Sequence, residues 1–192
     1  FFTGQHLKRD VFTSKLPYNI ISAIKKYSEK PTRIYNQTFE DELSKTVDSI
    51  DIVFVLGESV RADHLGINGY DRETTPLLNL QQNLISYSNI YTPLTYTAIS
   101  VPQILSNQSI HDTLIKEYTI LYSILNELKI STTWIGNQSI EKSYESIIKE
   151  NKNVYLIDAF HSVLSFKKQK DEELIKVFDT IDRDSAFTFT TI

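Results

Sequence analysis

One segment, Asp51-Ile-Val-Phe-Val-Leu-Gly-Glu-Ser-Val-Arg-Ala-Asp-His64, predicts how the chain folds. Its apolar residues 52–56 are typical of a buried β-strand. Gly57 then allows a sharp backbone turn, and the carboxylate of Glu58 follows just beyond the strand's carboxyl end. Because sites in open α/β sheets form at the carboxyl ends of the strands, Glu58 is a candidate site residue.

The rest of the chain alternates between helix and strand patterns. Proline-led or periodic segments predict helices over residues 17–27, 75–84, 114–128, 141–149 and 171–181. Runs of β-forming residues predict further strands over residues 85–91, 131–135, 153–157 and 186–192, with 153–157 buried. This order predicts an α/β fold with a mostly parallel sheet and helices on both faces.

Composition fits one domain and excludes several functions. The 192 residues are 41% hydrophobic, which suffices for a core, and the net charge of -4 gives no indication of nucleic-acid binding. There is no run of about 18 apolar residues that would form a transmembrane helix in this segment, and no three-part signal peptide. The absence of cysteine excludes disulfides and thiolate zinc sites. Because the first residue is Phe1, we expect a fragment of a longer protein.

Charge is distributed unevenly along the chain. Residues 1–33 contain seven Lys or Arg and two acidic residues, whereas the remainder contains thirteen basic and twenty-two acidic residues. A basic start suits contact with an anionic membrane surface. An ordinary solvated face has the same composition, so the charge pattern leaves both interpretations open.

A second candidate lies thirty-nine residues after Glu58, in Thr95-Tyr-Thr-Ala-Ile-Ser-Val-Pro102. Here Thr97 precedes a short apolar helix, so its hydroxyl is expected near a helix N-terminus, where backbone N–H groups favour negative charge. A threonine hydroxyl is a weak nucleophile unless a metal or a base activates it. The alternative is that Thr97 caps the helix, the most common role of threonine there. Thr92 and Thr95 are neighbouring candidates.

These segments resemble a known family. Gly57-Glu-Ser-x-Arg-Ala-Asp-His64, Gly69-Tyr-Asp-Arg-Glu-Thr-Thr-Pro76 and Thr97-Ala-x-Ser-Val-Pro102 are similar to motifs of the phosphoethanolamine transferases of Gram-negative bacteria. Those enzymes modify lipid A and related targets with an alkaline-phosphatase/sulfatase-like domain on the periplasmic side of a membrane anchor. This chain departs from the family pattern at Leu94, where the family has Gly, and at Gln103, where it has Cys.

The resemblance implies roles for individual residues. Thr97 matches the nucleophile, and Glu58 and Thr97 match ligands of Zn²⁺. The segment Trp134-Ile-Gly-Asn-Gln-Ser-Ile-Glu-Lys142 resembles a family stretch that lines the substrate pocket, which implies that Asn137, Gln138 and Lys142 bind substrate. Gln138 stands where the family has Asn, with a longer arm. Lys142 is able to pair with phosphate as a point charge, and its alternative is a solvated helix position.

The resemblance also implies how much of the domain is present. The family's later Asp-His pair, which completes the zinc site, and its Gly-Ser-His-Gly segment are absent from these residues. Residues 47–192 are therefore expected to be the N-terminal portion of the catalytic domain, incomplete at the C-terminus. Residues 1–46 are expected to be a basic linker whose helix at 17–27 lies at the membrane interface; the alternative is that this helix packs on its own domain.

Together these features predict a zinc-dependent phosphoethanolamine transferase. The donor would be phosphatidylethanolamine, the acceptor lipid A, a core sugar or another envelope molecule, and the intermediate a phosphoethanolamine group on Thr97. The parent protein would be anchored in the bacterial inner membrane with this domain on the periplasmic face. The alternatives are another sulfatase-like hydrolase or phosphotransferase, and a truncated relative without catalysis.

The histidines are not predicted to be zinc ligands. His64 is expected to be structural, and Arg61 and Asp63 are expected to hold the loop after Glu58 through a charged hydrogen bond. His6, His111 and His161 lack ligand spacing and are expected on the surface.

Overall fold

A computed structural model describes residues 20–21, 34–36, 44–92, 94–109, 117–157 and 170–192. The chain divides into two compact units, Phe1–Ile34 with Asp112–Glu117, and Tyr35–His111 with Tyr118–Ile192. The second unit contains the four-stranded sheet and the helices described below. Of the helix predicted over residues 17–27, only Ile20 and Ile21 are described, and both are helical and exposed; the rest lies outside the described residues.

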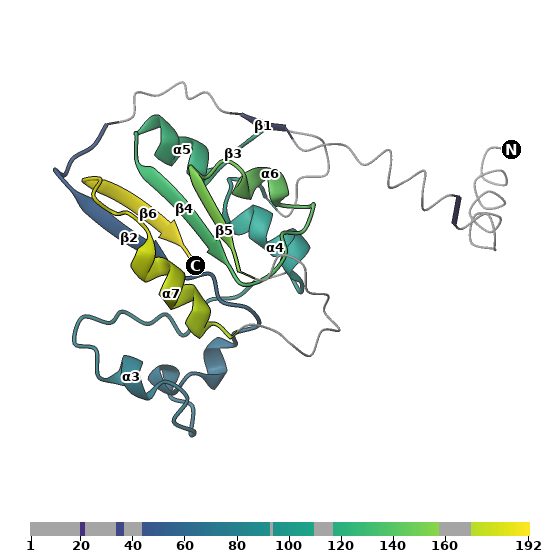
Figure 1. The fold of residues 1–192 in the computed structure, drawn as a ribbon. Helices are drawn as coiled ribbons and strands as arrows, with labels where there is room; N and C mark the ends of the chain where they lie inside the picture. The colour runs from purple at the N-terminus through teal and green to yellow at the C-terminus, as the bar shows by residue number, and fades with distance from the viewer. Residues whose placement is uncertain (1–19, 22–33, 37–43, 93, 110–116, 158–169) are drawn as a thin grey trace, which may run out of the picture. The chain divides into compact units, whose positions relative to one another are not determined.

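The centre of the second unit is a parallel sheet in the order β2-β6-β4-β5 (Figure 1). These strands are β2 (Ile50–Phe54), β6 (Phe187–Thr191), β4 (Ser131–Gly136) and β5 (Asn153–Leu156). Ile52 lies opposite Phe189, and Thr132 lies opposite Phe189 on the other side of β6. The β-branched and aromatic residues of β4 and β6 suit this doubly covered position. The predicted parallel sheet is confirmed.

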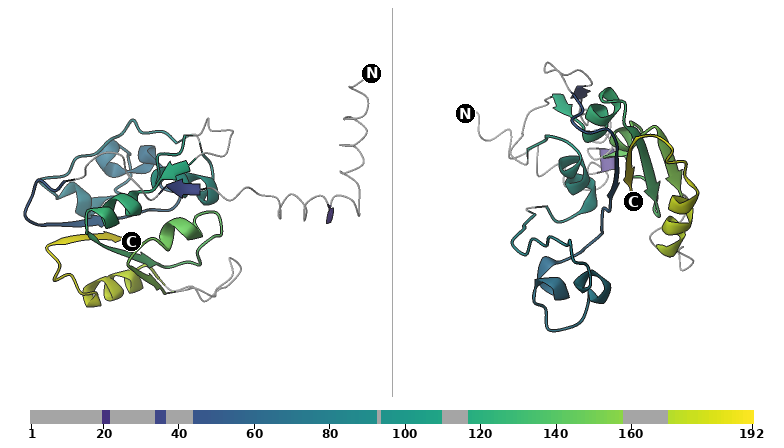
Figure 2. Two further views of the ribbon diagram at one scale, coloured as in Figure 1. Left: turned by 90° about the horizontal axis from the view of Figure 1, so that it is seen from above. Right: turned by 90° about the vertical axis from the view of Figure 1, so that its left-hand side faces the viewer.

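Helices lie against both faces of this sheet (Figure 2). On one face, α4 (Thr97–Ile104), α5 (Leu121–Glu127) and α6 (Glu145–Ile148) enclose the main core with Trp134 and Phe189. On the other face, α7 (Glu172–Thr180) packs against β4, whose Ile135 is fully buried. The sequence prediction of helices on both faces is confirmed.

Two predicted elements are wrong. Residues 85–91 form no strand, and Ile85, Tyr87, Ile90 and Tyr91 are all at least 65% exposed. An alternating pattern becomes a strand only where another strand satisfies its backbone, and within the described residues none pairs here. The helix predicted over 114–128 is divided: β3 (Glu117–Thr119) comes first and α5 begins at Leu121. The N–H of Leu121 bonds to the Leu105 carbonyl, and Ser106 bridges Ile120, so the 105–107 segment holds this stretch extended.

Smaller differences concern the ends and the burial of elements. The helices predicted over 75–84 and 141–149 shorten to α3 (Pro76–Asn79) and α6. Strand β5 lies at the sheet edge with Val154 and Tyr155 about two-fifths exposed, so it is not the buried strand predicted. The remaining elements are β1 (Ile34–Asn36), which pairs with β3, and the 3₁₀ turns η1 (Ala62–His64) and η2 (Gly66–Asn68). In the part of the chain that is described, no helix has the length and apolar character needed to cross a membrane.

Candidate functional site

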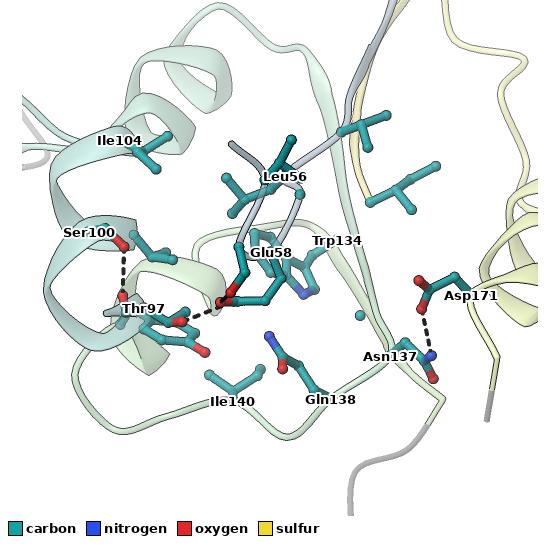
Figure 3. A pocket seen from close by; sticks show the side chains of 18 of the residues that line it. Leu56, Glu58, Thr97, Ser100, Ile104, Trp134, Asn137, Gln138, Ile140 and Asp171 are labelled. Carbon is teal, nitrogen blue, oxygen red and sulfur yellow. Dashed lines mark hydrogen bonds between the residues drawn. The ribbon is translucent and has the colours of Figure 1, made fainter. Parts of the chain in front are cut away.

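A pocket of about 760 Å³ opens at the carboxyl ends of β2 and β4. Its walls come from residues after β2, from the start of α4, from the loop after β4 and from the first turn of α7. Figure 3 shows Glu58 and Thr97 on one side of this pocket and Asn137 and Asp171 on the other. The pocket therefore lies where parallel sheets place their sites.

Glu58 and Thr97 meet inside the pocket. The hydroxyl of Thr97 donates a hydrogen bond of 2.9 Å to Oε2 of Glu58 (Figure 3). The other oxygen, Oε1, accepts a 3.0 Å hydrogen bond from Ser59, which has φ of 54°. Non-glycine residues in this left-handed region are uncommon and concentrate at functional sites. Two hydroxyl groups thus fix the carboxylate at the exit of β2.

The structure argues against one of the two roles considered for Thr97, that of a helix cap. Helix α4 begins at Thr97, and its N-cap residue is Tyr96, which makes no side-chain capping bond. The Thr97 hydroxyl bonds to Glu58, so Thr97 does not cap α4 and its position at the helix start leaves the oxygen in the pocket. Ser100, one turn later, also lines the pocket and donates to the Tyr96 carbonyl. Thr92 and Thr95 line the pocket as well.

The predicted substrate-binding residues fall in two places. Asn137 and Gln138 follow β4 directly and line the pocket, and Asn137 Nδ2 donates a 3.0 Å hydrogen bond to Asp171 Oδ1. Lys142 is exposed and is not among the lining residues. The charged residues that line the pocket within the described segments are Glu58, Asp171 and Glu172, all carboxylates. The walls described here are therefore electronegative.

The donor atoms present fit part of a zinc site. Zinc accepts oxygen ligands and is usually four-coordinate, and the Glu58 carboxylate and the Thr97 hydroxyl are two oxygen donors already in contact. No cluster of three or more His, Asp or Glu side chains occurs among the residues the structure describes. The two residues thus suit half of a tetrahedral site, as the sequence predicts.

Two further pocket residues, Tyr144 and Asp171, lie outside the motifs on which the sequence prediction was based. Tyr144 is 4% exposed and lines the pocket. Burial raises the pKa of Tyr144, and the carboxylates of Glu141 and Glu58 raise it further. Asp171 lies next to the first residue of α7, and only the docking of that helix on β4 brings it to the pocket. The sequence predicts Asp171 at the start of a helix, but an acidic residue there is commonly a helix cap. Its position therefore did not mark it as a pocket residue.

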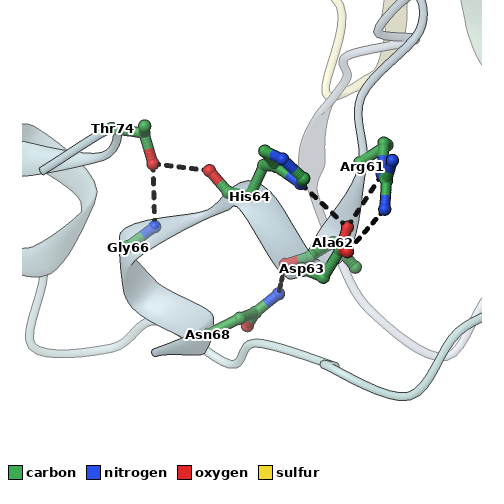
Figure 4. A network of polar contacts seen from close by, with 7 residues as sticks. All are labelled: Arg61, Ala62, Asp63, His64, Gly66, Asn68 and Thr74. Atoms are coloured by element: carbon green, nitrogen blue, oxygen red, sulfur yellow. Dashed lines mark hydrogen bonds and ion pairs between the residues drawn. The ribbon is translucent and has the colours of Figure 1, made fainter. Parts of the chain in front are cut away.

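The loop after Glu58 is held by its own polar contacts (Figure 4). Arg61 donates to both carboxylate oxygens of Asp63 at 3.0 and 2.6 Å, which confirms the predicted charged pair, and His64 Nδ1 lies 3.1 Å from Asp63. These contacts lower the pKa of Asp63 far below its usual range, the Arg61 hydrogen bond most strongly. His64 is outside the pocket lining. His6, His111 and His161 lie outside the described residues.

Comparison with known proteins agrees with the fold and motifs. The Sulfatase family model matches residues 50–190. The Kdo(2)-lipid A phosphoethanolamine 7''-transferase of Escherichia coli strain K12 is 30% identical over 73% of this chain and 27% of its own length. The phosphatidylethanolamine transferase Mcr-1 of Escherichia coli is 37% identical over 47% of this chain and 17% of its own. The chain thus spans about a quarter or less of these relatives.

A solved structure has the same fold. The zinc complex of the C-terminal periplasmic domain of EcEptC from Escherichia coli aligns with a TM-score of 0.66 and 21% identity, over 76% of this chain and 43% of that one. The alignment confirms the predicted sulfatase-like α/β fold. With the family model matching most of the residues, the chain belongs to the sulfatase family.

Proposed function

We propose that this chain is part of an enzyme that transfers phosphoethanolamine from phosphatidylethanolamine to a cell-envelope acceptor. The single observation that carries the proposal is the hydrogen bond from Thr97 to Glu58 in the pocket at the carboxyl ends of β2 and β4. Transferases of phosphoethanolamine among the relatives support this reaction. The acceptor would be lipid A, a core sugar or another envelope molecule.

The proposed reaction has two displacements at phosphorus, with Thr97 Oγ1 as the nucleophile of the first and the leaving group of the second. Thr97 Oγ1 forms a bond to the phosphorus of phosphatidylethanolamine, the bond from phosphorus to the glycerol oxygen breaks, and diacylglycerol leaves with the proton that Thr97 loses. An acceptor oxygen then attacks the phosphoethanolamine group on Thr97. The P–Oγ1 bond breaks, and Thr97 regains a proton from the acceptor. Covalent catalysis of this kind needs an activated nucleophile, and the N-terminus of α4, which begins at Thr97, would favour the developing negative charge.

Zn²⁺ is the proposed cofactor, held in part by Glu58 and Thr97. When bound, zinc favours the deprotonated form of an oxygen ligand and neutralises charge on phosphoryl oxygens. Glu58 keeps the Thr97 hydroxyl oriented by the hydrogen bond between them. A structural neighbour of this fold is a zinc complex, which supports the choice of metal.

The charge of the pocket favours this substrate over those of related enzymes. Its described charged lining consists of Glu58, Asp171 and Glu172. A phosphoethanolamine headgroup brings an ammonium that the Glu172 carboxylate would attract, whereas a sulfate ester or a phosphoglycerol group brings no positive charge. Opposite charges within hydrogen-bonding range are mutually stabilising. Asn137, Gln138 and Lys142 remain the proposed substrate-binding residues.

The proposed location follows from the donor. Phosphatidylethanolamine is a membrane lipid, and a structural neighbour of this fold is a periplasmic domain, so the domain would act at the periplasmic face of the bacterial inner membrane, with the parent protein anchored there. Residues 1–46 would form the linker to that anchor, and their basic charge would favour contact with anionic lipid headgroups. Residues 47–192 would be the N-terminal portion of the catalytic domain.

The test measures the intact mass of the full-length protein after incubation with zinc and phosphatidylethanolamine vesicles. We expect a gain of one phosphoethanolamine group, localised to Thr97 and absent in Thr97→Ala. Thr95→Ala is the matched control, because Thr95 lines the same pocket and should leave the adduct unchanged. An adduct that water releases as fast as lipid A removes it would indicate a hydrolase. No adduct on the wild-type protein would overturn the proposal.

A further inference from the structure

The hydrogen bond between Asn137 and Asp171 joins two walls of the pocket. The residues are 34 positions apart, and the Nδ2···Oδ1 distance is 3.0 Å. Figure 3 shows the two side chains pointing toward one another, one from the loop after β4 and one from the start of α7. Both line the same pocket as Thr97. The contact therefore connects α7 with the loop that carries Asn137 and Gln138.

The loop after β4 leaves the sheet under tight constraint. At the last residue of β4, a Cβ on Gly136 would lie 2.9 Å from Trp134 Nε1 and 3.2 Å from Leu156 Cδ2. The N–H of Ile157 bonds to the Gly136 carbonyl at 2.9 Å, which fixes the end of the strand. Residues 137–141 then belong to no helix or strand, and Gln138 is exposed. The direction of Asn137 and Gln138 thus depends on contacts beyond the strand.

Helix α7 packs on the sheet and can therefore hold Asp171 at the pocket. Its residues Leu174, Val177 and Phe178 are half-buried, and α7 contacts β4. The Asp171 carbonyl accepts a 3.0 Å hydrogen bond from the N–H of Leu174, so the residue is part of the first helical turn. A carboxylate at this end of a helix is also favoured by the macrodipole. The backbone of Asp171 is consequently held in place independently of Asn137.

We propose that Asp171 is a positioning residue, which fixes the amide of Asn137 and the course of the loop through Gln138 for binding the phosphoethanolamine headgroup. The inference rests on the proposed function. Asp171 accepts a hydrogen bond from an amide that the sequence predicts to bind substrate. An oriented amide loses less freedom when substrate binds. Without Asp171, the loop would sample other orientations and the headgroup would bind more weakly.

The test uses two readouts on the full-length protein. Calorimetry gives the Kd for soluble phosphoethanolamine, and intact mass gives the maximal rate of adduct formation on Thr97. For Asp171→Ala we expect Kd to rise about five- to tenfold, the size of one hydrogen bond, while the maximal rate changes less than about twofold. Asp171→Asn keeps an acceptor oxygen and should restore most of the affinity. Asp179→Ala removes an exposed carboxylate from the same helix outside the pocket lining, so it is the control and should leave Kd within about twofold of wild type.

A double-mutant cycle separates positioning from direct contact. If Asp171 acts through Asn137, Asp171→Ala added to Asn137→Ala should weaken binding no further. If the double variant raised Kd by the product of the two single effects, or if Asp171→Ala left Kd unchanged, the positioning role would be overturned. A wild-type protein that binds phosphoethanolamine but forms no adduct would sink the proposed transfer alone, and the Kd values would still decide the role of Asp171. No binding by the wild type would overturn both.

Discussion

The Thr97 hydroxyl lies 2.9 Å from Oε2 of Glu58, although 39 residues separate the two in sequence. Glu58 follows β2 and Thr97 opens α4, so the contact forms only when α4 packs on the sheet. A hydroxyl that donates to a carboxylate is oriented before any substrate arrives. The pair is thus the geometric centre of the candidate site, and it leads to the first prediction.

Glu58→Gln should remove zinc binding without unfolding the protein. The amide keeps an oxygen that can accept the Thr97 hydrogen bond, but it lacks the negative charge that zinc prefers in its ligands. We expect the zinc affinity to fall by at least about tenfold, measured as metal content after dialysis. Asp71→Asn in the following loop is exposed and lies outside the pocket lining, so it is the matched control. Equal zinc content in Glu58→Gln and wild type would rule out Glu58 as a ligand.

Tyr122→Phe should destabilise the fold through one buried contact. The Tyr122 hydroxyl and Thr191 Oγ1 are 2.8 Å apart, and both residues are fully buried. Removing the Tyr oxygen leaves the Thr191 hydroxyl without this partner, at a cost of about 1–3 kcal/mol in the free energy of unfolding, measured with urea. Adding Thr191→Val should recover part of the loss because both polar groups are then gone. Additive losses in the double variant would contradict this assignment.

Raising the pH above 10 should lower the free energy of unfolding, because the buried Tyr122 holds its proton more tightly in the folded state. Burial raises the pKa of Tyr122 to about 12 from its ordinary value of 10.0. The folded state therefore holds this proton more tightly, so its contribution is complete below pH 10.0 and is lost as pH rises toward 12. Over that window the free energy of unfolding should fall by about 2–3 kcal/mol from this group. Tyr122→Phe should show a correspondingly shallower decline between pH 10 and 12 in urea unfolding, and an identical decline would disprove the assignment.

Gly136→Ala should disturb the pocket through Trp134. The added Cβ would come within 2.9 Å of Trp134 Nε1, so the indole has to move. We expect a loss of about 1–3 kcal/mol in the free energy of unfolding and a red shift of fluorescence. Trp134 is the single tryptophan and is 9% exposed, so the emission reports on this site. At Gly57 a Cβ would be 3.3 Å from a Val60 methyl group, so Gly57→Ala should leave the emission unchanged. An unshifted spectrum in Gly136→Ala would refute the predicted clash.

Arg61→Ala should raise the pKa of Asp63 toward its ordinary value of 3.8. The Arg61 hydrogen bond is the largest cause of the lowered pKa, followed by the bond with His64. Because the folded-state pKa is depressed, the pair stabilises the fold above the unfolded pKa and this contribution is lost as pH falls. Carboxyl NMR titration measures the shift, and Arg61→Lys should retain part of it. A pKa unchanged in Arg61→Ala would assign the depression to His64 instead.

Several parts of the fold were predictable from residues next to one another in sequence. The strands at 131–135 and 186–192 and the helix at 171–181 agree with β4, β6 and α7. In each, the pattern of residues within the segment itself indicates the type of element. Residues 85–91 have an equally good alternating pattern but pair with no strand in the described part of the chain. Pattern alone cannot say whether a partner strand is available.

The sequence by itself determined the parallel α/β class, the carboxylate of Glu58 after a strand and the hydroxyl of Thr97 at a helix start, because these depend on local turn chemistry and residue periodicity. The strand before Glu58 is not the buried strand predicted: β2 is an edge strand, and Val53 and the following Val55 are exposed. Tertiary structure alone decided that β6, last in the chain, lies between β2 and β4. It also decided that Thr97 bonds to Glu58 and that Asp171 reaches Asn137. These contacts join residues far apart in sequence, and they arise from strand pairing and helix docking, which no local pattern encodes.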